Sequence, residues 1–302
     1  MQRALRGITY NVHSRFNQPQ IIVKPGETFQ AETELCTGNW LNRLEDTWSP
    51  DKTNALNPTV VVAVSGAKPG QVLAVDVLAI EPDRLGYTGF NAQSNPLASE
   101  IYRDKPWAMN TKTLRIEDGL VHWSDTLKLP IQPMIGTLGV APPEESLSNA
   151  RGGRHGGNMD VQEVCPGATV YLPIMVPDAL LHIGDVHAIQ GDGEICCAGG
   201  VECRSLVTLR VRLVDVPAVH ECVRIENETH IMTVACERSV RESFLLASEQ
   251  MLKWMNADYG ISIEEGYLLM GQVLEARNTQ FVNPTYSYVC KMNKSYLHNV
   301  HQ

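Results

Sequence analysis

The chain has 302 residues, of which 43% are hydrophobic and 20% charged, and its formal net charge is −9 at pH 7. This balance excludes a disordered chain, which carries far less apolar material, and a membrane protein, which carries more. The net negative charge and the scattered Lys and Arg residues exclude a nucleic-acid partner, because phosphate binding requires clustered basic side chains. A neutral or cationic small ligand suits this composition better.

The N-terminal segment and the cysteines indicate the compartment. Residues 1–16 contain Arg3, Arg6 and Arg15 and no apolar run, so they lack the apolar core of a signal peptide. The 8 cysteines follow neither a zinc-finger spacing nor that of a secreted disulfide framework. We therefore expect reduced thiols and a cytoplasmic protein.

Residues 21–234 read mainly as short strands separated by turns. The segments 59–64, 71–80 and 168–176 are almost continuously apolar, which is typical of strands buried on both faces. The segment 206–214 instead alternates apolar and polar residues, and this period of two predicts a half-buried strand.

Three of these strands follow the same type of turn. The tripeptides are Lys24-Pro25-Gly26, Lys68-Pro69-Gly70 and Cys165-Pro166-Gly167. Proline fixes φ at the first central position, and glycine permits the positive φ that a type II turn requires at the second. Each tripeptide therefore predicts a type II turn that leads into a strand.

The clear helix signals come late in the chain. Ser239 and Glu242 have capping-box spacing, and apolar residues then recur at helical intervals, which predicts a helix over 239–255 before Gly260. Ser262 and Glu265 repeat the capping box before a second, shorter helix. Strand character returns near the end.

These patterns predict a mostly β fold, like a β-sandwich or barrel, with a C-terminal helical hairpin; an α+β fold is the alternative. We expect a single domain over 1–302, with the β part over 1–234, a helical layer over 237–275 and a terminal strand over 281–292.

The segment 152–160, G-G-R-H-G-G-N-M-D, is dense in glycine and polar residues. Asn158 and Asp160 are two residues apart, so on a strand both side chains would project from one face. The preceding glycines allow a sharp turn or the close approach of a ligand. A surface turn with capping residues explains the same composition equally well.

A second polar segment, 182–194, reads H-I-G-D-V-H-A-I-Q-G-D-G-E. Asp185 and His187 are two residues apart, as are Asp192 and Glu194, and such pairs can present oxygen and imidazole ligands to one metal ion. Gln190 is placed to bind an amide or to orient a ligand. An acidic hairpin turn is the alternative, but closely spaced acids between apolar strands need a cation or a proton to balance them.

The two segments together resemble the paired signature of the acetamidase/formamidase family. Further similar stretches are P-M-I-G-T-L-G-V-A-P at 133–142, E-T at 32–33, C-T-G-N at 36–39, N-P-T-V-V-V-A-V-S-G-A-K-P-G at 57–70 and V-N-P at 282–284. The resemblance thus extends over nearly the whole chain. It implies a mostly β enzyme that hydrolyses a formamide- or acetamide-like substrate with a divalent metal. We expect zinc, with calcium as the alternative, and a homo-oligomer.

The resemblance also suggests roles for individual residues. The implied metal ligands are Asp160, Asp185, His187 and Glu194; the implied catalytic residues are Glu194, Asp192 and Asn158; the implied substrate-binding residues are His155, Gln190 and Glu32. Glu194, or else Asp192, would act as general base, and Asn158 would stabilise the oxyanion. One position departs from the family pattern, because Leu35 stands where an acidic residue usually precedes Cys36, and Glu34 is a candidate substitute.

Two alternatives to a metal-assisted amidase stay open. The first is covalent catalysis by a thiol in the segment that holds Cys196, Cys197 and Cys203, although the neighbouring acids would raise a thiol pKa. The second is a non-catalytic metal-binding β protein that holds a small ligand or builds an assembly.

Overall fold

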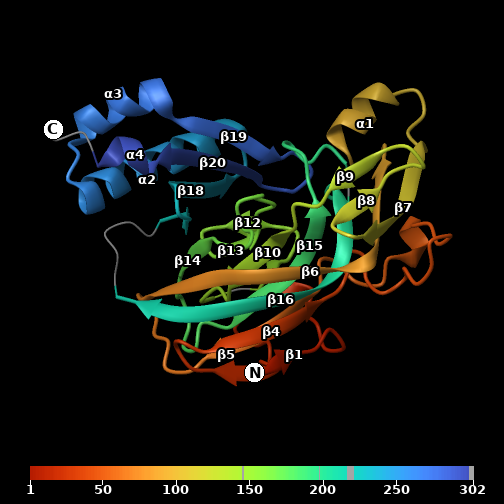
Figure 1. Ribbon diagram of the computed structural model, residues 1–302, viewed down its shortest axis with the longest axis horizontal. Helices are drawn as coiled ribbons and strands as arrows, with labels where there is room; N and C mark the ends of the chain where they lie inside the picture. The colour runs from red at the N-terminus through yellow and green to blue at the C-terminus, as the bar shows by residue number, and fades with distance from the viewer. Residues whose placement is uncertain (145, 197, 216–220, 299–302) are drawn as a thin grey trace.

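The computed structural model describes residues 1–144, 146–196, 198–215 and 221–298. Within these ranges, eighteen strands are hydrogen-bonded into one continuous sheet that curls around a central core (Figure 1), and β2 and β11 form a separate two-stranded sheet. The fold is therefore mostly β, as the sequence predicts. None of the described helices is long and apolar enough to cross a membrane.

The elements of the first half of the chain are β1 (Arg3–Ala4), β2 (Val12–His13), β3 (Ile21–Val23), β4 (Thr28–Thr33), β5 (Thr59–Val64), β6 (Val72–Asn91), α1 (Pro96–Ile101), β7 (Met109–Glu117), β8 (Leu120–His122), β9 (Lys128–Pro130), β10 (Met134–Val140) and β11 (Leu147–Ser148). A short 3-10 helix spans Pro50–Lys52.

The elements of the second half are β12 (Gly152–Gly153), β13 (Gly156–Asn158), β14 (Thr169–Pro173), β15 (Leu181–Ile189), β16 (Val201–Val214), β17 (Val223–Glu226), β18 (His230–Glu237), α2 (Val240–Tyr259), α3 (Ile263–Val273), β19 (Glu275–Gln280), β20 (Tyr286–Asn293) and α4 (Lys294–Leu297).

The three predicted type II turns are present. Gly26, Gly70 and Gly167 have φ values of 91°, 92° and 92°. In each turn the backbone N–H that follows the glycine donates to the carbonyl three residues earlier, at 3.0 to 3.1 Å. The turns start β4, β6 and β14.

The two longest strands of the sheet, β6 and β16, pair with each other in antiparallel orientation. Their pairing runs from Val72 opposite Val214 to Tyr87 opposite Glu202. Beyond this pair β6 continues into an arm of β7, β8 and β9 that carries α1, at the upper right of Figure 1. The sequence signals did not predict α1, a helix of only 6 residues that begins at a proline.

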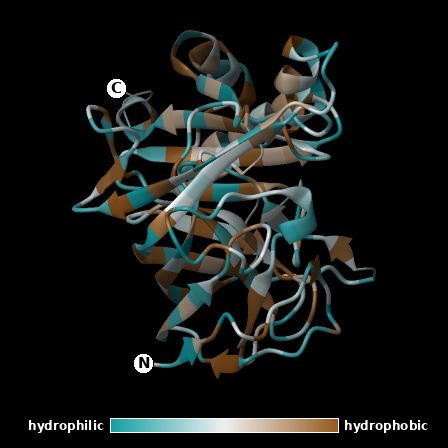
Figure 2. Ribbon diagram, turned by 90° about the vertical axis from the view of Figure 1, so that its right-hand side faces the viewer, coloured by the Kyte–Doolittle hydropathy of each residue, from teal (hydrophilic) through white to brown (hydrophobic). Residues whose placement is uncertain are grey.

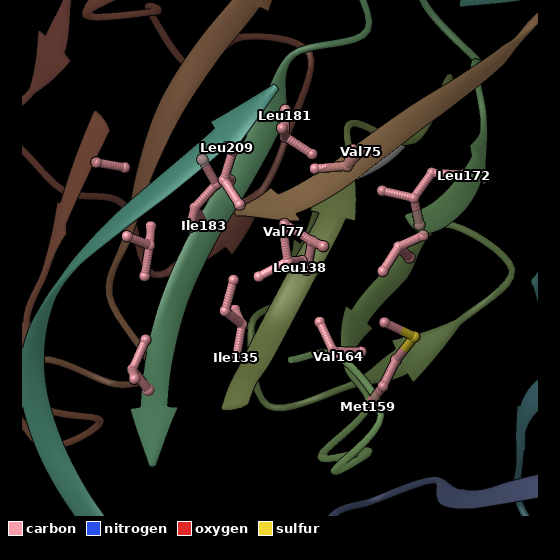
Figure 3. Close-up of a cluster of buried hydrophobic side chains, with 14 of the residues drawn as sticks. Val75, Val77, Ile135, Leu138, Met159, Val164, Leu172, Leu181, Ile183 and Leu209 are labelled. Atoms are coloured by element: carbon pink, nitrogen blue, oxygen red, sulfur yellow. The ribbon is translucent and has the colours of Figure 1, made fainter. Parts of the chain in front are cut away.

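The core lies between strands from both halves of the chain. Figure 3 shows Val75 and Val77 of β6 facing Leu138 of β10 and Ile183 of β15, and all four are fully or almost fully buried. The hydropathy view shows hydrophobic segments along the strands and mostly hydrophilic loops at the periphery (Figure 2). Burial of this apolar surface is the main stabilising contribution.

Both predicted helices begin at the predicted caps. The hydroxyls of Ser239 and Ser262 each accept a hydrogen bond, at 3.1 Å, from the backbone N–H three residues later. Helix α2 continues past residue 255 to Tyr259 and ends where Gly260 adopts a φ of 68°. Helix α2 packs on β18 and β20, and α3 packs on α2, around a second core that includes Met251.

Candidate active site

Four acidic side chains and one histidine meet in the interior beside β15, and we call this group the acidic cluster. Its members are Asp160 after β13, Asp185 and His187 on β15, Glu194 in the loop after β15, and Glu202 on β16, which pairs with His187 across the strands. The Nε2 atom of His187 lies 3.2 Å from Glu202, 3.6 Å from Asp185 and 3.8 Å from Asp160. All five residues are at most 6% exposed.

The backbone at the cluster adopts an unfavourable conformation. Asp160, Asp185 and Glu194 have positive φ values of 49°, 58° and 40°. A non-glycine residue in this region costs free energy, and such residues gather where function requires a particular side-chain direction. Asp185 does so within a strand, so the chain departs from regular β geometry where it presents this carboxylate.

Two glycines leave room for the acidic cluster. A Cβ on Gly136 of β10 would lie 2.4 Å from Asp160 Oδ1 and 2.7 Å from Asp185 Oδ2. A Cβ on Gly199 would lie 2.3 Å from His187 Cε1 and 2.5 Å from Glu194 Oε1. Any larger residue at either position would therefore occupy space that the cluster uses.

Burial and mutual repulsion govern the electrostatics of the cluster. Burial and then Asp185 raise the pKa of Asp160 to about 6, and the same two causes raise the pKa of Glu202 to about 8. Burial and then Asp160 raise the pKa of Glu194 well above its usual range. Burial disfavours a charge on His187, but Glu202 and Asp185 raise its pKa well above the usual value. The acids thus need protons or a cation to stay buried.

The donor atoms of the cluster fit a divalent cation. Asp160, Asp185 and His187 each offer a ligand atom, and these atoms lie within 4.8 Å of one another. Asp160 Oδ1 and both ring nitrogens of His187 are buried without a hydrogen-bond partner among the described residues. No described Lys or Arg forms an ion pair with the four acids, whose only cationic neighbour is His187. Mixed imidazole and carboxylate ligands suit zinc and related metals.

Comparisons with known proteins point to one family. Residues 145–224 match the Acetamidase/Formamidase family. The chain is 26% identical to a formamidase of Methylophilus methylotrophus, and the match covers 67% of this chain and 64% of that protein. An acetamidase of Mycolicibacterium smegmatis is 25% identical and is matched over 62% of its length. The matches therefore span slightly less than two thirds of the curated relatives.

Two solved acetamidase-family structures match over all or nearly all of their length. An acetamidase from Bacillus halodurans superposes with a TM-score of 0.91 at 30% identity, covering 99% of this chain and 100% of that one. The chain belongs to the acetamidase/formamidase family. A predicted acetamidase/formamidase from Thermoanaerobacter tengcongensis superposes equally well, at 29% identity and with 98% of its chain covered.

In this acetamidase/formamidase family member, two more of the predicted residues lie against the acidic cluster. The Thr137 hydroxyl lies 2.7 Å from Asn158 Oδ1 and 3.2 Å from Asp185 Oδ2, so it donates to one or the other. The Gln190 amide donates to the backbone carbonyl of Asp160 at 3.1 Å, and Gln190 Oε1 is buried without a partner among the described residues. Gln190 therefore fixes the backbone at Asp160, whereas Asn158 reaches the cluster only through Thr137.

Two predicted acids lie elsewhere. Asp192 points to the surface, where its side chain is 67% exposed and its carboxylate pairs with Arg277 at 2.8 Å. Alternation along the strand had suggested that Asp192 and Glu194 share a face, but a turn at Gly193, with a φ of 82°, separates them. Glu32 lies on the outer face of β4 and pairs with Arg3 at 3.6 Å. Neither carboxylate joins the cluster.

His155 joins a different group, three buried imidazoles that we call the histidine cluster. Its ring lies edge-on to His13 at 4.9 Å, and His13 stacks on His182 at 4.5 Å. Burial lowers the pKa of His155 to about 4 and that of His182 to about 3. All three are therefore neutral near pH 7, since burial also holds the pKa of His13 well below its usual value.

The sequence reasoning missed Glu202 and did not assign a role to Cys36. Cys36, Asp185 and Glu202 form a second group whose ligand atoms lie within 4.8 Å of one another. Cys36 Sγ also lies 3.1 Å from the hydroxyl of the buried Tyr87. One signal was available, a lone acid flanked by Val201 and Cys203 shortly before the predicted strand 206–214.

The Leu35 departure has a structural counterpart. Leu35 is fully buried and packs with Leu41 and Tyr87 in a small apolar core. Glu34 does not replace the missing acid, because its carboxylate pairs with Arg204 and accepts from the backbone N–H of Leu35.

The thiols of the signature segment lie in different surroundings. Burial raises the pKa of the Cys196 thiol, and burial raises the pKa of Cys203 to about 12. Both shifts disfavour a reactive thiolate. Cys197 lies outside the described residues. Within them, Cys165, Cys196, Cys203, Cys222, Cys236 and Cys290 are free thiols.

Proposed function

We propose that this protein hydrolyses a short-chain carboxamide, formamide- or acetamide-like, to a carboxylate and ammonia. The observation that carries the proposal is the buried acidic cluster. Carboxylate and imidazole atoms without hydrogen-bond partners converge there, and no described Lys or Arg forms an ion pair with its acids. The names of the relatives, acetamidase and formamidase, supply the reaction class.

In this proposal Asp160, Asp185 and His187 hold a divalent cation, with zinc the expected metal and calcium the alternative. A bound divalent cation supplies a water of lowered pKa and a Lewis acid for the carbonyl oxygen. Glu202 lies 3.2 Å from the same His187 Nε2 atom that faces Asp160 and Asp185, so its carboxylate lies on the ligand side of the ring and not behind it. The Thr137 hydroxyl is placed to donate to the Asp185 carboxylate, from which it lies 3.2 Å.

We assign Glu194 the role of general base and acid rather than of ligand. Its Oε2 atom is buried without a partner among the described residues, and Glu194 also lines a pocket that opens beside the cluster. Hydrolysis adds water oxygen to the carbonyl carbon, breaks the C–N bond and delivers a proton to the leaving nitrogen. A carboxylate that takes the proton from water and passes it to nitrogen completes this balance.

The experiment is ammonia release from formamide, acetamide, propionamide and urea, before and after chelation and after the metal is restored. Glu194→Gln should lower kcat by about 10²–10⁴-fold with KM little changed, because general base catalysis contributes on this order. Metal content should stay at the wild-type level. Glu264→Gln, an exposed residue of α3, is the matched control and should keep wild-type turnover.

Covalent catalysis is the second candidate. Its nucleophile would be Cys36, whose sulfur lies in the site beside Asp185 and Glu202, although these two acids disfavour a thiolate. An acyl adduct on Cys36 in rapidly quenched reactions, seen by mass spectrometry, would favour this route. A Cys196, Cys197 and Cys203 triple Ser variant should keep much of its rate in either case. Bound metal without ammonia release would instead favour a non-catalytic metal-binding protein.

Assembly and compartment also stay predictions. We expect a homo-oligomer, which light scattering on the eluted protein would measure, and a cytoplasmic location, which fractionation of the source cells would test.

A further inference from the structure

An apolar pocket of about 310 Å³ adjoins the acidic cluster. Its walls are mainly hydrophobic and include Trp123 and Leu129 from the β8–β9 hairpin, Ile189 at the end of β15, Val201 at the start of β16, and Ile195. Its size falls at the lower end of the ~300–1,000 Å³ range of small-molecule sites. The pocket is thus large enough for a ligand and chemically suited to an apolar one.

The pocket and the cluster share Glu194, which lines the first and belongs to the second. Trp123, Leu129 and Ile189 are only partly buried against the main core, so part of their apolar surface is available to a ligand. Ile195, 53% exposed, lies on the same loop as Glu194. A molecule with its amide at Glu194 would therefore extend its acyl group over apolar walls.

The residues that shape this pocket lie mostly outside the polar segments of the signature. Trp123 and Leu129 come from the arm, and the Lys112 ammonium lies 4.7 Å from the Trp123 ring centroid on the ring face. This cation–π contact stabilises the observed orientation of the indole. The arm therefore contributes one wall to a site whose polar residues lie on or next to β13, β15 and β16.

We propose that this pocket binds the acyl chain of the substrate, and that the preferred substrates are primary amides with an apolar chain of about three to six carbons. The inference rests on the proposed amide hydrolysis and specifies its substrate class. A formyl or acetyl group would leave most of the pocket to water, whereas each buried methylene contributes about fourfold to binding or to kcat/KM.

The test measures kcat/KM of the holoenzyme for the straight-chain series from formamide to hexanamide. We expect a rise of about fourfold per methylene until the pocket is filled. Leu129→Ala should lower kcat/KM for hexanamide about tenfold and change the value for formamide less than twofold. Leu127→Ala is the matched control, since this leucine is 45% exposed on the same hairpin and is not part of the pocket wall.

A binding measurement separates this inference from the proposed activity. Calorimetry with the Glu194→Gln variant should show that hexanamide binds at least tenfold more tightly than acetamide, and that adding Leu129→Ala removes this difference. If no amide releases ammonia, the proposed function fails, and the same binding difference would still support the pocket assignment. Equal binding of both amides, or a wild-type enzyme fastest on formamide, would overturn the assignment.

Discussion

A methyl group at Gly136 would test whether the geometry of the acidic cluster matters for function. Gly136 lies on β10, and its φ is not positive, so alanine fits the backbone without conformational strain. The added Cβ would lie 2.4 Å from Asp160 Oδ1 and 2.8 Å from the backbone carbonyl oxygen of Asp185. The perturbation therefore acts on the two acids and on little else.

The expected magnitude follows from these distances. An ordinary contact to Cβ starts at 3.4 Å, so Asp160 Oδ1 must move by about 1 Å, and the Asp185 carbonyl is held in a strand. Overpacking of this kind typically costs about 1–3 kcal/mol of unfolding free energy. Metal-ligand distances tolerate only about 0.2 Å, and a misplacement of about 1 Å in an active site can cost about 10²-fold in rate. Activity should therefore fall while the protein stays folded, because this loss is smaller than the total unfolding free energy of about 5–15 kcal/mol.

We expect Gly136→Ala to lower kcat/KM for amide hydrolysis about 10²-fold and to weaken Zn²⁺ binding, as measured by calorimetry. Urea unfolding should show a loss of about 1–3 kcal/mol. Gly7→Ala is the matched control, because a Cβ there meets no atom within 4 Å, and it should match the wild type. Wild-type activity and Zn²⁺ affinity in Gly136→Ala would refute the view that this glycine makes room for a functional cluster.

Three further predictions concern stability. Burial lowers the pKa of His155 to about 4, whereas its pKa in the unfolded chain is 6.5. The contribution of His155 to the unfolding free energy is therefore complete above pH 6.5 and is lost as the pH falls below this value. Urea titrations should thus show that the unfolding free energy of the wild type, relative to His155→Phe, drops by about 2 kcal/mol between pH 7.5 and 5; parallel curves would contradict this. Burial raises the pKa of Asp76, but hydrogen bonds from Arg212, Thr169 and Arg210 outweigh it and lower this pKa to about 2. Asp76→Asn should therefore lower the unfolding free energy by about 1 kcal/mol at pH 7, and the difference from the wild type should shrink as the pH falls from about 4 towards 2. A difference that does not change with pH would mean that the ion pairs do not contribute to stability. Ser239→Ala should cost about 1 kcal/mol in thermal or urea unfolding, and no loss would mean that the cap of α2 is dispensable.

Local sequence patterns were sufficient to predict the elements whose signals depend on near neighbours. The type II turns depend on adjacent proline and glycine, and the starts of α2 and α3 depend on a serine and the backbone three residues later. The mostly β class follows from the strand periodicity. The polar segments likewise identified Asp160, Asp185, His187 and Glu194, because a run of acids and histidine between apolar strands is unusual.

Tertiary structure alone decided which of the remaining side chains share the site. Along β16, residues on the same face as Glu202, such as Thr208 and Arg210, are partly or fully exposed, so alternation by itself would place Glu202 towards solvent. Glu202 is buried instead because Tyr87 pairs opposite it and Cys36 lies against it, from segments more than 100 residues earlier in the chain. Conversely, Asp192 is only two residues from Glu194, yet the turn at Gly193 directs it to Arg277 on the surface. Sequence spacing determines local geometry, whereas burial depends on the distant strands that pack against each face.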